Sequence, residues 1–146
     1  MTDAPYFHVC TVVPDLEAAM AELTAAIGVS WQAPRDRESG EMRWRLVYSA
    51  DGPPFIELVE GQPGTPWHSP DGPRLHHFGR FATDLDAGIR AIEEAGGHIE
   101  TDGREISGRW AYLRVPASGA LIELIEADDE GRARFLSPVP PPPMED

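Results

Sequence analysis

The chain contains the same sequence pattern twice, and this duplication constrains its fold more than any other feature. The segment that starts at His8 returns 69 positions later at His77, and both copies continue into an Asp-Leu-x-Ala motif. A second segment, Ile-Glu-Leu around Glu57, returns 66 positions later around Glu123. Matched segments at a nearly constant spacing indicate that one structural unit was duplicated within the chain.

The length of the chain sets how the two copies can be arranged. A chain of 146 residues has the size of one domain, so two units, about residues 5–62 and 74–127, have to share one hydrophobic core. We therefore expect a single domain over residues 1–130. Residues 131–146 are rich in proline and predict an extended, poorly ordered tail.

The composition excludes several classes of function. The chain has 25 acidic and 12 basic residues, a net charge of −13, and every basic residue is arginine. Because it has no basic stripe, the protein is not expected to bind nucleic acid or anionic membranes. Because it has no lysine, it cannot use a lysine Schiff base in catalysis. One cysteine cannot make an internal disulfide, and no apolar run approaches the ~20 residues of a membrane span. With no secretory signal, we expect a cytoplasmic protein without nucleic-acid or membrane partners.

Each copy reads as a strand, a helix and three further strands. In the first copy, apolar residues recur at helical spacing after Asp15, a suitable N-cap, and the run stops at Gly28. Turn residues then separate the later apolar runs into strands. The strands expected in the first copy are 6–13, 29–35, 42–49 and 55–60. The second copy is expected to contain a helix over 84–95 and strands over 75–82, 98–105, 109–116 and 120–126.

Alternation along the predicted strands places four polar side chains in one hollow. In strand 55–60, Ile56 and Leu58 provide the apolar face that a helix needs, so Glu57 points to the opposite, concave face. A buried unpaired carboxylate is costly, and a metal ion removes that cost. The duplicated pattern gives the same face to a second glutamate and to one histidine per copy. The predicted metal ligands are therefore His8, Glu57, His77 and Glu123.

Several nearby residues are candidates for the wall of a substrate pocket. Cys10 belongs to the concave face and could line the pocket, although its chemistry favours the role of a small buried thiol. Trp44 recurs as Trp110 at the same shift as the glutamates. Trp31 and Trp67 stand in connecting segments from which they could close over a ligand. The predicted pocket residues are Cys10, Trp44, Trp67 and Trp110.

Other polar residues have plainer explanations. His76 competes with His77 as a ligand, but strand alternation and the match to His8 favour His77. Glu60 and Glu126 also recur, on the other face near strand ends, where we expect them to meet solvent. A dense basic cluster has two open explanations, a charged sheet rim or a contact for an anionic substrate tail. Its members are Arg35, Arg37, Arg43 and Arg45.

Four segments carry a resemblance to a known family. They are Phe7-His8-Val9 with Pro14-Asp15-Leu16, Pro54-Phe55-Ile56-Glu57-Leu58, Leu75-His76-His77-Phe78 and Leu121-Ile122-Glu123-Leu124. In these segments the chain resembles the vicinal oxygen chelate superfamily, which includes glyoxalase I, methylmalonyl-CoA epimerase, extradiol dioxygenases and bleomycin-resistance proteins. The resemblance implies an α+β fold in which two tandem βαβββ units form a cupped, partly closed mixed sheet with helices on the convex face. It also implies that the first and last strands of each unit supply the ligands of a divalent ion.

The predicted ligand set narrows the chemistry. Two imidazoles and two carboxylates suit one divalent ion of Fe, Co, Ni, Zn or Mn. Such an ion would polarise a carbonyl group and stabilise an enediolate or enolate as a proton leaves the adjacent carbon. The resemblance to glyoxalase I and the epimerase implies that Glu57 or Glu123 takes or returns that proton. We therefore expect a metal-dependent isomerase, epimerase or lyase for a small oxygenated substrate, with Glu57 and Glu123 as its catalytic residues.

Two other functions remain open. A non-catalytic protein could bind an antibiotic or a metabolite in the cup between its tryptophans. A non-haem iron dioxygenase is the second alternative, although such sites usually combine two histidines with one carboxylate. In each case we expect a small-molecule ligand and a homodimer.

Overall fold

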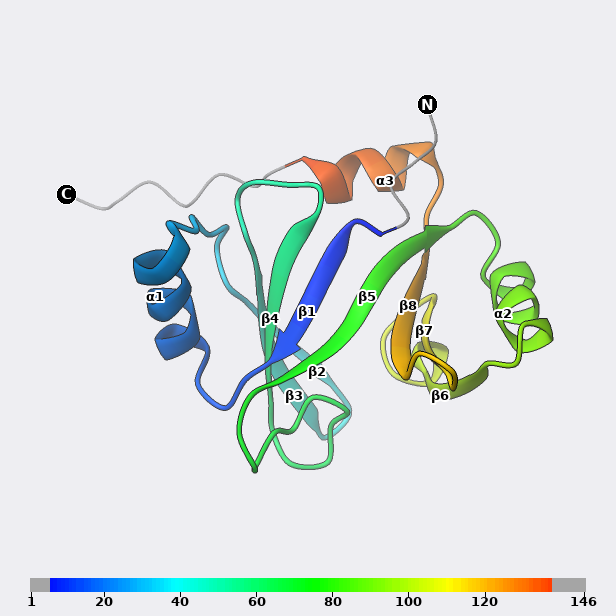
Figure 1. The fold of residues 1–146 in the computed structure, drawn as a ribbon, viewed down its shortest axis with the longest axis horizontal. Helices are drawn as coiled ribbons and strands as arrows, with labels where there is room; N and C mark the ends of the chain where they lie inside the picture. Colours follow the sequence, from blue (N-terminus) through cyan, green and yellow to red (C-terminus); the bar gives the residue numbers. More distant parts are fainter. Residues whose placement is uncertain (1–5, 138–146) are drawn as a thin grey trace.

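The structure, a computed structural model, describes residues 6–137. Within this range the chain forms one eight-stranded sheet, three α-helices and a short 3₁₀ turn (Figure 1). The first unit contains β1 (His8–Val12), α1 (Leu16–Ile27), β2 (Arg35–Ser39), β3 (Met42–Tyr48) and β4 (Phe55–Gly61). The second unit contains β5 (Arg74–Ala82), α2 (Leu85–Glu94), β6 (His98–Asp102), η1 (Gly103–Glu105), β7 (Trp110–Val115) and β8 (Ala120–Glu126), and α3 (Asp129–Leu136) follows it.

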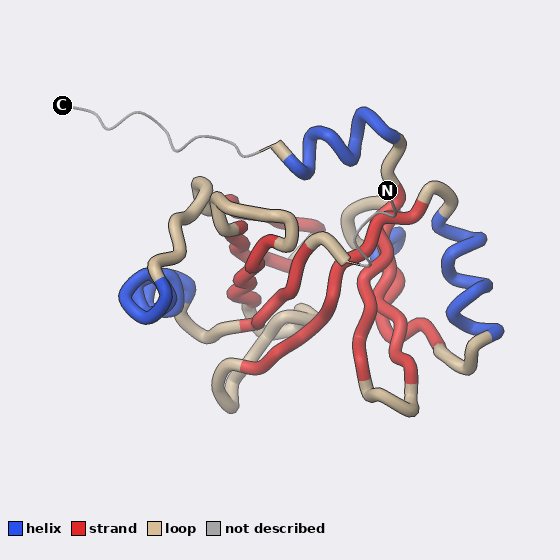
Figure 2. Tube along the Cα trace, turned by 45° about the horizontal axis from the view of Figure 1, so that its top comes forward, coloured by secondary structure: helices blue, strands red, loops and turns tan. Residues whose placement is uncertain are grey.

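The two units form the two halves of one mixed sheet. Its strand order is β2-β3-β4-β1-β5-β8-β7-β6, so both halves have the same internal order. β1 runs parallel to β4, and β5 runs parallel to β8, whereas β1 and β5 pair antiparallel where the halves meet. The sheet is strongly curled rather than flat (Figures 1 and 2). These features confirm the predicted α+β fold with two βαβββ units in a cupped mixed sheet.

The two long helices cover the convex face, as predicted. Asp15 caps α1 by accepting a hydrogen bond from the Ala18 N–H at 3.0 Å, and Gly28, with a φ of 73°, ends the helix. Asp84 caps α2 by accepting from the Ala87 N–H at 3.0 Å. The buried apolar side chains between α1 and the sheet are Val13, Leu16, Val47 and Leu58, and those between α2 and the sheet are Leu85, Ile89, Ala111, Leu113 and Leu124.

Glu60 and Glu126, near the ends of their strands, accept hydrogen bonds from the first backbone N–H groups of the two long helices. Glu60 Oε2 accepts a hydrogen bond from the backbone N–H of Leu16 at 2.7 Å, and Glu126 Oε2 accepts one from Leu85 at 2.9 Å. The first N–H groups of a helix have no partner within the helix. Each glutamate therefore ties the last strand of its unit to the start of the helix of the same unit, and the expectation of a purely solvent-facing role was wrong.

The strand expected over 29–35 lies further along the chain. β2 begins at Arg35, and within residues 29–34 the structure has only an isolated bridge between Trp31 and Ser49. Pro34 explains the shift, because proline has no N–H to donate to a strand ladder. In the second unit, the strand expected over 98–105 ends at Asp102, and the chain turns into η1.

A third helix, α3, occupies part of the segment for which the sequence predicts an extended tail. Asp128 caps it by accepting a hydrogen bond from the Gly131 N–H at 2.7 Å. Its Phe135 ring lies 5.8 Å from the ring of Phe7 and 5.6 Å from that of Phe81. Figures 1 and 2 show α3 across one end of the sheet, away from α1 and α2. The proline run of the predicted tail falls in 138–146, outside the described residues.

None of the helices in the described range has the length and apolar character of a membrane-spanning segment.

Candidate metal centre

The four predicted ligands come from the four central strands of the sheet and meet in one place. Their positions are His8 on β1, Glu57 on β4, His77 on β5 and Glu123 on β8. All four are buried, with exposed fractions of 0%, 6%, 2% and 8% in that order. Because these strands are neighbours in the sheet, equivalent positions in the two units lie around the junction between the halves. The convergence that the sequence predicts is therefore present within a single chain.

The distances among the four side chains suit ligands of one ion. The Nε2 atoms of His8 and His77 lie 3.0 Å apart. Glu123 Oε2 lies 2.6 Å from His77 Nε2 and 3.3 Å from His8 Nε2, and Glu57 Oε1 lies 3.4 and 3.5 Å from the same two atoms. Two ligand atoms that are each about 2.1 Å from an ion, at right angles, lie roughly 3 Å apart. The donor set thus fits a divalent ion both in geometry and in chemistry.

The charges of the cluster point to a cation. Burial alone raises the pKa of Glu123, but His77 and His8 lower it to about 2. The pKa of Glu57 is also below its usual value, because the two histidines outweigh its burial. Burial lowers the pKa of His77, but Cys10 and Glu123 hold it well above its usual range. Two ionised carboxylates in a buried hollow need a positive charge between them. A protonated histidine supplies it when no ion is bound, and a divalent cation held by the four side chains would supply it instead.

His77 is held from behind by its neighbour in sequence. His76 Nδ1 lies 2.8 Å from His77 Nδ1, on the side of the ring away from the cluster. Burial is the main cause that lowers the pKa of His76 to about 4, so this imidazole is neutral. Metal-ligating histidines usually have such a partner on the second ring nitrogen. His8 differs, since its Nδ1 is buried and has no hydrogen-bond partner among the described residues. The geometry supports the choice of His77 over His76 as the ligand.

A cavity of about 300 Å³ opens onto the cluster. Glu57 and Glu123 line it, and so do the predicted wall residues Trp44, Trp67 and Trp110. Cys10 does not. It is fully buried in an apolar cluster with Trp44 and Trp67, and this burial raises the pKa of its thiol to about 12. Of the two roles considered for Cys10, the structure shows the buried thiol and not the pocket wall, because the tryptophan rings pack against it and leave it no exposed surface.

The sequence reasoning missed two tyrosines of the site. The ring of Tyr48 lies 5.4 Å from that of His8, and the ring of Tyr112 lies 4.7 Å from that of His77. Burial, and then the charges of Glu57 and Glu123, raise the pKa of both phenols well above the usual value, so both are neutral donors. Strand alternation was the signal that could have found them. Tyr48 shares a face of β3 with Trp44, and Tyr112 shares a face of β7 with Trp110.

Trp31 lies away from the cavity. Its Nε1 donates hydrogen bonds to the Met20 carbonyl at 3.1 Å and to Thr24 Oγ1 at 3.0 Å, both on α1. It packs with the apolar residues under that helix. The expectation that Trp31 closes over a ligand was wrong, since the isolated bridge to Ser49 directs this segment toward the convex side.

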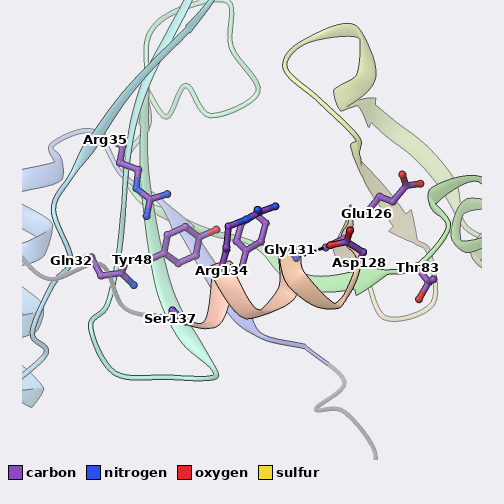
Figure 3. A pocket seen from close by; sticks show the side chains of 11 residues that line it. Gln32, Arg35, Tyr48, Thr83, Glu126, Asp128, Gly131, Arg134 and Ser137 are labelled. Atoms are coloured by element: carbon purple, nitrogen blue, oxygen red, sulfur yellow. Dashed lines mark hydrogen bonds between the residues drawn. The ribbon is translucent and has the colours of Figure 1, made fainter.

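A second hollow, of about 500 Å³, lies between α3 and the cup (Figure 3). It shares Arg35, Tyr48 and Phe135 with the first cavity. Phe135 of α3 therefore stands between the two hollows, and α3 borders the open side of the site. All four candidate ligands come from one chain, so the site needs no second copy, and the predicted homodimer stays a prediction.

Comparisons with known proteins agree with this architecture. The model of the Glyoxalase/Bleomycin resistance protein/Dioxygenase superfamily matches residues 7–113. Among functionally curated proteins, none matches the sequence significantly. Methylmalonyl-CoA epimerase from Mycobacterium tuberculosis has a similar structure, with a TM-score of 0.62 and 22% identity over 91% of this chain and 96% of its own.

Two further solved structures share the fold. A complex of Streptomyces coelicolor methylmalonyl-CoA epimerase with 2-nitronate-propionyl-CoA aligns with a TM-score of 0.57 and 20% identity, over 85% of this chain and 97% of the epimerase. A mutant of 4-hydroxymandelate synthase from the same organism aligns with a TM-score of 0.59 and 18% identity, over 90% of this chain and 51% of the synthase. At these identities the likeness is one of fold. Because the family model spans most of both units, the chain belongs to the glyoxalase, bleomycin resistance protein and dioxygenase superfamily, the vicinal oxygen chelate proteins that its sequence resembles.

Proposed function

We propose that the protein is a metal-dependent enzyme of the isomerase or epimerase type, which moves a proton on the carbon next to a carbonyl group of a small oxygenated substrate. One observation carries the proposal. Glu57 and Glu123 come from equivalent strands of the two units, and both line the same cavity beside His8 and His77. The similar fold of two methylmalonyl-CoA epimerases supports this reaction type.

The ligand roles follow from the donor set. His8, Glu57, His77 and Glu123 would hold one divalent ion of Fe, Co, Ni, Zn or Mn. Such an ion would supply Lewis acidity, which polarises a carbonyl oxygen and makes the neighbouring C–H more acidic. Four ligands from the chain leave less room for dioxygen beside a substrate than three would, and this favours proton transfer over the dioxygenase alternative.

The carboxylates are the bases in this proposal. Both are ionised at neutral pH, since the pKa of Glu123 is about 2 and that of Glu57 is below its usual value. One carboxylate could take the proton from the carbon and, as the carboxylic acid that this forms, return it on the same side. Return on the opposite side would need the glutamate of the other unit to have taken up a proton from water first. Neutral Tyr48 and Tyr112 could donate hydrogen bonds to substrate oxygens, and the tryptophan rings give the cavity apolar walls.

Elemental analysis of the purified protein tests the metal. We expect about one tightly bound divalent ion per chain. The variant His77→Ala should lose it. The control is His98→Ala, which removes an exposed imidazole from β6 and should keep the ion. A wild-type protein that binds no divalent ion at micromolar concentrations would contradict the proposal.

Proton exchange tests the reaction. In D₂O, the metal-loaded protein should exchange the acidic C–H of methylmalonyl-CoA or of a small hydroxyketone such as dihydroxyacetone, measured by NMR. Glu57→Gln and Glu123→Gln should each slow exchange by about a hundredfold or more.

A non-catalytic binder is the second candidate, because three tryptophans line the cavity. Tight binding of an aromatic compound by metal-free protein, with no exchange of any substrate tested, would select it over the enzyme.

A further inference from the structure

We propose that Arg35 and Arg37 form an anion-binding subsite in the wall of the metal-site cavity, and that the substrate is a small carboxylic acid whose carboxylate binds there. The inference deepens the proposed function by naming a substrate class. It rests on the proposed function only for the reaction that takes place beside Glu57 and Glu123. The subsite itself rests on three observations: both arginines line the cavity, neither has a carboxylate partner in the described range, and the second unit has no equivalent arginines.

Both arginines belong to the inner face of β2. Arg35 lies opposite Leu46, and Arg37 lies opposite Trp44, on the neighbouring strand β3. Residues directly opposite each other on paired strands share a face of the sheet. All four side chains line the 300 Å³ cavity that also contains Glu57 and Glu123. Figure 3 shows the Arg35 side chain directed inward, toward Tyr48.

The two guanidinium groups have no carboxylate partner among residues 6–137. Arg37 donates only one hydrogen bond in this range, to the Asp36 carbonyl at 3.3 Å. Several other arginines pair with the acidic surface. The closest contacts of this kind are Arg45–Glu17 at 2.6 Å, Arg104–Asp86 at 2.6 Å, Arg109–Glu126 at 2.7 Å and Arg114–Glu100 at 2.8 Å.

Arg43, Arg74 and Arg90 also have no carboxylate partner in this range, so it is their place in the cavity lining that distinguishes Arg35 and Arg37. The chain has a net charge of −13, yet Arg35 and Arg37 line a cavity with N–H donors that no carboxylate uses. Such guanidinium groups are suited to bind the anionic group of a ligand.

The second unit has no such pair, so the cavity is polarised from one side to the other. Thr101 of β6 lies opposite Tyr112, as Arg35 lies opposite Leu46, and Gly103 follows where the first unit has Arg37. The Trp110 ring occupies the space at Gly103, where an added Cβ would lie 2.0 Å from Trp110 Cδ2. The β2 side of the cavity therefore carries two guanidinium groups, whereas the β6 side is closed by the Trp110 ring.

This polarity fits a ligand with one charged end and one apolar end. A carboxylate can accept two parallel hydrogen bonds from a guanidinium group. The overall negative charge of the chain repels an anion at long range, so local positive charge is needed to admit one. A divalent ion held by Glu57 and Glu123 would offset their charge, and Arg35 and Arg37 would then be the remaining charged groups of the cavity lining.

Calorimetric titration of the purified protein with a matched pair of probes tests the inference. Benzoylformate carries a carboxylate beside a ketone on a ring, and benzoylformamide has the same shape and oxygens without the charge. We expect the acid to bind about tenfold or more tightly than the amide. Arg35→Gln and Arg37→Gln should each weaken binding of the acid by about tenfold or more, and leave binding of the amide unchanged within about twofold.

The control variant is Arg43→Gln. It removes the same charge from β3, but at an exposed position opposite Glu38, outside the cavity. It should change binding of neither probe by more than about twofold. Equal binding of acid and amide by the wild type, failure of both to bind, or an equal loss of acid binding in all three variants would overturn the subsite.

Metal content, measured in every variant, separates this inference from the proposed function. A protein that prefers the acid through Arg35 and Arg37 but holds no divalent ion would retain the subsite and lose the proposed enzyme. A metal-bound protein that exchanges substrate protons but does not prefer the acid would retain the enzyme and lose the subsite.

Discussion

Gly79 lies directly opposite His8 across the pairing of β1 and β5, and the imidazole of His8 occupies the space where any other residue would have its side chain. A Cβ at position 79 would lie 1.9 Å from His8 Cε1. The absence of a side chain at Gly79 thus fixes the orientation of the candidate ligand His8, although Gly79 itself offers no ligand atom.

Gly79→Ala should therefore displace the His8 ring and reduce the affinity for a divalent ion by at least about tenfold. Metal titration followed by calorimetry measures this. The control is Gly88→Ala on α2, where the nearest atom to an added Cβ is the flexible end of Leu124 at 2.9 Å. Unchanged metal affinity in a folded Gly79→Ala protein would show that His8 is not a ligand.

His76 should act on the site through His77. Its Nδ1 contact with His77 Nδ1 at 2.8 Å orients that ring, and loss of such partners typically weakens metal binding about 10- to 100-fold. His76→Ala is expected to lower metal affinity by this factor while one ion per chain still binds at saturation. His98→Ala, exposed on β6, is the matched control. A complete loss of stoichiometric binding would instead place His76 among the ligands.

The contact between Trp67 and Tyr112 supports the cavity wall. Trp67 Nε1 donates a hydrogen bond to Tyr112 Oη at 2.8 Å, and both residues are 3% exposed. Tyr112→Phe leaves the indole N–H buried without an acceptor, which should lower the free energy of unfolding by about 1–3 kcal/mol in urea denaturation. Ser107→Ala removes the acceptor of the Trp110 N–H at an exposed site, and should cost less than about 0.5 kcal/mol. Equal losses would contradict this account.

Glu126 should make stability depend on pH in the acidic range. The Arg109 side chain, at 2.7 Å, and then the Leu85 N–H lower its pKa from 4.5 to about 2. A carboxylate whose pKa is lower in the folded state stabilises the fold above its unfolded pKa, and this stabilisation is lost as pH falls through the folded value. Glu126→Gln should therefore have a lower thermal midpoint than the wild type at neutral pH.

The difference in midpoint should shrink as the pH falls from 4.5 to about 2, because both proteins then carry a neutral side chain at position 126. Glu130→Gln, an exposed change on α3, is the control and should leave the midpoint nearly unchanged over the same range. A midpoint difference that stays constant with pH would mean that the Glu126 contact stabilises the fold without its charge.

Much of the architecture could be predicted because its signals are local or repeated. The Asp15 cap acts on a backbone group three residues away, so the sequence pattern alone predicts it, and its repeat Asp84 caps the second helix in the same way. The face of each strand follows from alternation, which placed Glu57 and Glu123 opposite the helices. Duplication then supplied the long-range information, since equivalent positions in two units of one sheet lie close together.

The remaining features depend on contacts between segments that no local pattern encodes. The inward face of Cys10 was predicted, but not the tryptophan packing that covers it. Gly79 has a role only because His8 lies across from it. The basic cluster divides by strand face, with Arg35 and Arg37 in the cavity, and this depends on where β2 begins after Pro34.

Periodicity, capping and an internal repeat were thus enough to establish the unit, its duplication and the four side chains that converge, because each of these is a property of backbone geometry along the chain. The depth of the cavity, its cationic and aromatic ends, and the placement of Phe135 beside it arise from how the curled sheet brings distant strands and α3 together. Such contacts depend on side-chain volumes and strand register across the whole domain, which are settled when the core packs.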